Sequence, residues 1–227
     1  VKSGSTTTAT GSVTVFEGAQ TTTAPSAVTE GDAFTFSVAT TDVAPGSVAG
    51  RVENYTITGP GLSHIPAAER SGTVTLDANG NATVTVHTLA DFGPTGATSV
   101  FVQVGNNLSS TVVINETATQ TVSVNGSPSP VTINQGQSLT FTINTQGVAG
   151  GAVAGQVETW TLTGTGINQV TGGVLSGTVT LDGNGSAVVT VNTDFAIING
   201  PATQNLVFTV RSGSFVTATQ SATINES

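Results

Sequence analysis

The heptapeptide SGTVTLD at Ser71–Asp77 recurs letter for letter at Ser176–Asp182, and this repeat decides the fold of the chain. The shift from position 71 to position 176 is 105 residues. The stretch VAPGSVAGRVENY at Val43–Tyr55 returns as VAGGAVAGQVETW at Val148–Trp160 with the same shift. A constant shift over separate stretches predicts two copies of one folding unit.

Apolar and polar residues alternate with a period of two around the heptapeptide. Val74 and Leu76 precede the turn DANGN, and Val84 and Val86 follow it, which predicts a β-hairpin in each copy. The same alternation recurs at Phe34, Phe36 and Val38, at Leu139, Phe141 and Ile143, and at Leu206, Phe208 and Val210. With about seven short strands per copy and no helical period, the sequence predicts an all-β fold of two tandem immunoglobulin-like antiparallel β-sandwiches.

The start of the chain resembles the end of the second copy. Val1–Val15 matches Val210–Ile224 position by position, so we expect residues 1–17 to be a terminal strand homologous to the end of a repeat, within a longer array. The alternative is a first strand that belongs to the first sandwich. The repeats then span residues 18–117 and 118–227, and the short junction INETATQTV at Ile114–Val122 predicts an extended rod with limited freedom.

Composition excludes several classes of function. There are 13 acidic residues against 4 scattered cations, a net charge of −9, so we expect no nucleic-acid partner. Cysteine is absent, which rules out disulfides and thiolate metal sites. No apolar run is long enough for a membrane helix, so we expect no membrane insertion. No signal peptide opens the chain, and a fragment cut from a longer protein would not show one. An acidic chain without cysteine is typical of bacterial surface proteins, which favours an extracellular location.

No catalytic constellation is predicted, and we expect the protein not to be an enzyme. His64 and His87 align with Gln169 and Asn192, so neither is repeated, and we expect both at the surface. The repeated acids Glu53/Glu158 and Asp77/Asp182 are expected to serve solubility. The equivalent aromatics Tyr55 and Trp160 are interpreted as core residues that bridge two sheets, with a sugar-stacking platform as the alternative.

The segments VTEGDAFTFSV (Val28–Val38), YTITGPG (Tyr55–Gly61) and SGTVTLDANGNATVTV (Ser71–Val86) resemble bacterial Calx-beta and related immunoglobulin-like tandem repeats of large surface proteins. The resemblance implies a sandwich used as a repeated module in adhesins, surface layers or other secreted assemblies. It also implies Ca²⁺ as a cofactor, with Glu30 and Asp91 as weak metal ligands, although their counterparts are Gln135 and Asp194. The alternative is that Glu30 and Asp32 form a solvated turn.

We therefore expect a non-enzymatic structural module of an extracellular repetitive protein, in a surface layer, a fibre or an adhesin stalk. Its expected partners are neighbouring repeats or copies of the same protein, joined by strand addition through Val1–Val15. A glycan- or ice-binding module, acting through the divergent loops or exposed threonine rows, is the second hypothesis, with surface glycans as partners. A virion decoration or tail protein is the third.

Overall fold

The computed structural model describes residues 2–3, 6–7, 18–44, 46–93, 96–106, 110–195 and 202–226. Within these ranges the chain forms strands and short 3₁₀ turns. The turns are η1 (Pro60–His64), η2 (Ala67–Glu69), η3 (Gly150–Val153), η4 (Thr165–Gln169) and η5 (Thr171–Gly173). No helix in these ranges is long and apolar enough to cross a membrane.

The first sandwich packs a three-stranded sheet against a five-stranded sheet. The smaller sheet has the order β3 (Ala19–Thr23), β5 (Ala33–Thr41), β8 (Asn81–His87). The larger sheet has the order β4 (Ala27–Thr29), β10 (Ser110–Glu116), β9 (Gly96–Val104), β6 (Val52–Thr58), β7 (Ser71–Thr75). All neighbours are antiparallel except β4 and β10, which run parallel.

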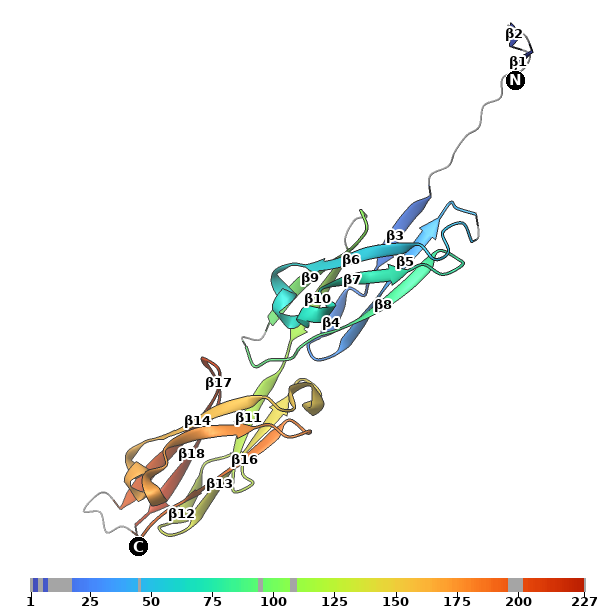
Figure 1. Ribbon diagram of the computed structural model, residues 1–227. Helices are drawn as coiled ribbons and strands as arrows, with labels where there is room; N and C mark the ends of the chain where they lie inside the picture. The colour runs from blue at the N-terminus through green and yellow to red at the C-terminus, as the bar shows by residue number, and fades with distance from the viewer. Residues whose placement is uncertain are drawn as a thin grey trace.

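The second sandwich repeats this topology strand for strand. Its smaller sheet has the order β11 (Thr119–Val124), β13 (Ser138–Gln146), β16 (Ser186–Asn192). Its larger sheet has the order β12 (Val131–Asn134), β18 (Phe215–Asn225), β17 (Thr203–Ser212), β14 (Val157–Thr163), β15 (Ser176–Thr180), again with one parallel pair, β12 and β18. The predicted immunoglobulin-like fold is confirmed, and the two sandwiches lie end to end with the chain passing from β10 to β11 between them (Figure 1).

The expectation for residues 1–17 lies largely outside the described residues. Within that segment the structure describes only β1 (Lys2–Ser3) and β2 (Thr6–Thr7), which pair with each other as an antiparallel two-stranded sheet. Strand addition by this segment therefore stays a prediction.

The core interpretation of the two repeated aromatics is confirmed. Tyr55 is 9% exposed and meets Phe36 edge to face, while Trp160 is 8% exposed and stacks on Phe208. Each ring lies over the glycine directly opposite it on the neighbouring strand, the second residue of SGTVTLD. A Cβ at Gly72 would lie 2.8 Å from the Tyr55 ring, and one at Gly177 would lie 2.9 Å from the Trp160 ring. Close packing explains why this residue is glycine in both copies.

The prediction of a β-hairpin at DANGN is wrong. A tight turn does form there, because Asp77 Oδ1 accepts the backbone N–H groups of Asn79 and Asn81 at 2.8 and 2.9 Å. However, β7 pairs with β6 and β8 pairs with β5, so the turn carries the chain from one sheet to the other. Alternation reveals which side chains face inward, but it does not reveal which strands pair.

Candidate functional site

The junction between the sandwiches is organised by a buried carboxylate. The chain leaves β10 at Glu116 and enters β11 at Thr119, so only Thr117 and Ala118 connect them. Glu30 lies in the turn between β4 and β5 and is 1% exposed. Its Oε1 accepts the N–H groups of Thr117 at 2.5 Å and Ala118 at 2.7 Å. Its Oε2 accepts a third N–H, that of Asp91, at 3.1 Å. One side chain thus ties the connection to the end of the first sandwich.

These contacts show where the two predicted calcium ligands, Glu30 and Asp91, lie in the structure. Glu30 and Asp91 do come together, but through the backbone N–H of Asp91, whose own Oδ1 accepts the N–H of Gly93 at 2.7 Å. Both Glu30 oxygens already accept N–H donors, which a cation would have to displace. Across the described ranges, no three His, Cys, Asp or Glu side chains are grouped so that they could hold a metal. Calcium binding stays a prediction, and the alternative of a solvated turn is wrong for the buried Glu30.

A loop of the first sandwich seals the end of the second. Ala90 and Phe92, in the segment after β8, are 5% and 3% exposed and belong to the apolar core of the second sandwich. Gln156 Nε2 donates a hydrogen bond to the Ala90 carbonyl at 2.8 Å. At Gly31, whose φ is +80°, an added Cβ would lie only 2.6 Å from the Cβ of Ala152. The two sandwiches therefore share a close-packed, hydrogen-bonded contact.

We call the covered end of the second sandwich the closed socket. It is formed by Gln120, Thr145, Val148, Val153, Gln156 and Glu158. The equivalent positions in the first sandwich form the open socket, comprising Gln20, Thr40, Val43, Val48, Arg51 and Glu53. The strand register supports this equivalence, because Gln20 pairs with Thr40 and Gln120 pairs with Thr145.

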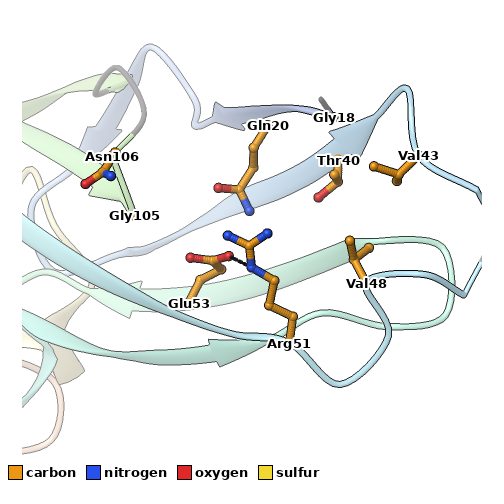
Figure 2. A pocket seen from close by; sticks show the side chains of 9 residues that line it. All are labelled: Gly18, Gln20, Thr40, Val43, Val48, Arg51, Glu53, Gly105 and Asn106. Atoms are coloured by element: carbon orange, nitrogen blue, oxygen red, sulfur yellow. Dashed lines mark ion pairs between the residues drawn. The ribbon is translucent and has the colours of Figure 1, made fainter. Parts of the chain in front are cut away.

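The open socket contains a cavity of about 420 Å³, which Gly18, Gly105 and Asn106 also line. The side chains of Gln20, Arg51 and Glu53 point toward one another in its middle (Figure 2). Arg51 Nε lies 2.6 Å from Glu53 Oε1, and the side chains of Arg51 and Glu53 are 62% and 9% exposed. The cavity is thus polar at its centre, with a cation that still reaches water.

Glu158 occupies the place of Glu53 in the closed socket, where Gln156 replaces Arg51. It is fully buried, and neither carboxylate oxygen has a hydrogen-bond partner of standard geometry among the described residues. Burial raises the pKa of Glu158 above its usual value of 4.5, and the Ser212 and Gln120 side chains only partly oppose this rise.

The expected solubility role is therefore wrong for Glu53 and Glu158. A signal for their burial was present in the sequence, because each lies two residues before Tyr55 or Trp160 on an alternating strand and so shares the inward face. Their charge alone predicts a surface position for both residues. The two turn acids, Asp77 and Asp182, are instead turn-forming residues, since Asp182 repeats the hydrogen bonds of Asp77 by accepting the N–H groups of Asn184 and Ser186.

The two histidines have different environments. His64 is 7% exposed, with Nδ1 3.3 Å from the Leu89 carbonyl and Nε2 3.3 Å from Glu116 Oε1, so the prediction of a surface position is wrong for it. His87 is exposed as predicted, and its Nδ1 lies 3.0 Å from Glu69 Oε1. The backbone N–H of His87 donates to Glu69, and chiefly this bond lowers the pKa of that carboxyl. Each histidine contacts a different glutamate and neither contacts the other.

No family model and no curated protein sequence matches this chain. Among solved structures the chain is similar to trypsin-activated α2-macroglobulin from Escherichia coli, with 14% identity and a TM-score of 0.34, over 92% of this chain and 15% of that one. It is also similar to fibronectin(III)-like modules of Clostridium thermocellum CbhA, with 11% identity and a TM-score of 0.27, over 91% of this chain and 94% of that one. The fold class rests on the strand topology, and the Calx-beta resemblance stays a prediction.

Proposed function

We propose that this chain is a non-enzymatic structural module, a two-sandwich spacer that holds its ends apart in an extracellular repetitive protein such as a surface layer, a fibre or an adhesin stalk. The observation that carries the proposal is the junction. A spacer has to keep its domains in one orientation, and Glu30 ties down both connecting residues while Ala90 and Phe92 enter the next core. Two residues of connection leave little room for hinge motion.

The orientation of the sandwiches tests this role directly. Small-angle scattering combined with residual dipolar couplings should give one fixed arrangement for the native chain. Glu30→Ala should broaden it, because three N–H donors lose their acceptor. Asp32→Ala, which removes an exposed carboxylate two residues away, is the matched control. A native chain whose sandwiches reorient freely would contradict the proposed role.

The extracellular location rests on the acidic charge and the absence of cysteine, a composition that is common among bacterial surface proteins. Protease treatment of intact source cells checks it, because a surface protein is cleaved while a cytosolic marker survives. Full protection of the chain in intact cells would contradict the location.

Strand addition is part of the same proposal. Each sandwich exposes edge strands, β7 and β8 in the first and β15 and β16 in the second, and such edges can accept a further strand. Deleting residues 1–17 should abolish polymers that grow in this way. Polymers that form unchanged without these residues would show that the segment is not the added strand.

A further inference from the structure

The open socket is the counterpart of a surface that is covered elsewhere in the same molecule. In the closed socket, Val153 is completely buried and belongs to the same apolar core as Ala90 and Phe92 of the first sandwich. Its counterpart Val48 is only half-buried and lines the open cavity. Equivalent strands thus form equivalent ends in the two sandwiches. Within the described residues, only this end of the second sandwich has a neighbouring domain packed against it.

The far end of the second sandwich carries a residue suited to this socket. Phe195 is 76% exposed. Its ring lies against Gly136, where an added Cβ would be 2.2 Å from Phe195 Cε2. Ala90 lies against the equivalent Gly31, with its Cβ 3.3 Å from the same imagined atom. Phe195 therefore takes the place of Ala90, one of the two residues that enter the core of the second sandwich.

Charge also matches between the two ends. Asp194 is exposed beside Phe195, while Arg51 in the open socket is one of only four cations in a chain of net charge −9. The side chain of Arg51 is 62% exposed, so its guanidinium remains available to an incoming carboxylate or aromatic face. The closed socket has the neutral Gln156 at this position, bonded to a carbonyl of its occupant.

We propose that the open socket receives the Phe195 end of a second copy of this chain, so that modules stack head to tail and repeat the internal junction between molecules. The contact joins unlike ends, so each added copy leaves a free socket and a free Phe195 end, and the contact can propagate into a fibre. Phe195 fills the apolar side of the socket formed by Val43 and Val48, and Arg51 faces Asp194. The inference builds on the proposed structural role, yet the two fail separately.

Sedimentation velocity over a wide concentration range tests the contact. The native chain should grow from single molecules into a series of larger species. For Phe195→Ser, the same degree of association should require a protein concentration at least about tenfold higher, because the substitution removes the aromatic anchor. Phe215→Ser is the matched control, since Phe215 is a 50% exposed phenylalanine at the start of β18, and this variant should assemble like the native chain.

Cross-linking identifies which ends meet. The native chain has no cysteine, so Ser47→Cys, at the position equivalent to Ala152, and Asp194→Cys provide unique thiols. On oxidation, mixed Ser47→Cys and Asp194→Cys chains should form disulfide heterodimers in preference to homodimers. The exposed Val188→Cys should not join Ser47→Cys in this way.

Three outcomes would overturn the inference. One is a native chain that stays monomeric at all concentrations, and another is a Phe195→Ser chain that assembles as the native chain does. The third is a socket that binds an oligosaccharide from a glycan array through Arg51 and Glu53 while copies fail to associate. In each case a fixed arrangement of the two sandwiches in the scattering experiment would still support the structural role.

Discussion

The open and closed sockets are built from equivalent strands, but the buried glutamate that each contains has a different environment. In the open socket Glu53 has Arg51 at 2.6 Å, and water reaches the pair. In the closed socket Gln156 replaces Arg51 and donates its hydrogen bond to the Ala90 carbonyl, so Glu158 has no ionic partner among the described residues. A cation therefore lies at the end that no neighbouring domain covers among the described residues, and a neutral amide lies at the end that the first sandwich covers. Sealing the socket over an arginine would carry a desolvation cost that glutamine avoids.

Removing the seal should have the largest effect. Phe92→Ala should lower the free energy of unfolding of the second sandwich by about 3 to 5 kcal/mol, because a buried aromatic leaves a cavity. Trp160 is the only tryptophan and stacks on Phe208, so its fluorescence during denaturation reports on this sandwich. Phe195→Ala, at an exposed position, should change the value by less than about 0.5 kcal/mol. Equal effects of the two changes would refute the difference between the sockets.

Cutting the tie at the junction should rank second. Glu30→Ala should lower the free energy of unfolding by about 2 kcal/mol, because three backbone donors lose their carboxylate acceptor. Denaturation in calcium and in chelator provides the contrast. If the carboxylate acts through hydrogen bonds, the loss is the same in both solutions. A native chain that loses a similar amount on chelation alone would instead support the calcium prediction for Glu30 and Asp91.

The buried acid of the closed socket should respond to pH. The pKa of Glu158 is raised above 4.5 in the folded state, so the folded protein holds this proton more tightly than the unfolded chain does. Its contribution to stability is present below pH 4.5 and is lost as the pH rises through the folded pKa. Glu158→Gln should therefore stabilise the second sandwich by about 1 kcal/mol at pH 7 and by little at pH 4, measured through Trp160 fluorescence.

The open socket supplies the control for that experiment. Glu53→Gln breaks the ion pair with Arg51 and should give no gain at pH 7 in calorimetry. A gain of equal size at both positions would mean that the cover over Glu158 makes no difference.

The smallest effect is expected at Glu69, which lies away from both sockets. Its pKa is lowered chiefly by the backbone N–H of His87, so its contribution is present above pH 4.5 and is lost as the pH falls through the lowered pKa. Because the side chain is 31% exposed, Glu69→Gln should cost at most about 0.5 kcal/mol at pH 7 in calorimetry. A cost above that of Glu30→Ala would overturn the ranking.

The repeat and the alternation of residues predicted the fold, because inward faces and turn residues follow from local spacing. Strand pairing could not be predicted in the same way, and the DANGN turn joins two sheets where a hairpin was expected. The resemblance to Calx-beta repeats pointed to Glu30 as a metal ligand. Its contacts with Thr117 and Ala118 join residues 87 and 88 positions apart in the sequence, and no local pattern predicts a contact over that separation. The spacing of Glu158 from Trp160 indicates that Glu158 faces inward, whereas its charge favours a surface position.

The parallel pairs β4–β10 and β12–β18 have a mechanical consequence. In each sandwich, β4 or β12 lies close to where the chain enters, and β10 or β18 is the strand by which it leaves. Once β3 or β11, the strand that comes first in each sandwich, has detached, a tensile load along the chain pulls the two strands of each pair in opposite directions along their length. Their interstrand hydrogen bonds are strained together, whereas bonds loaded at one end of a ladder break one after another. The topology thus gives both sandwiches a shear-resistant clamp along the line of force.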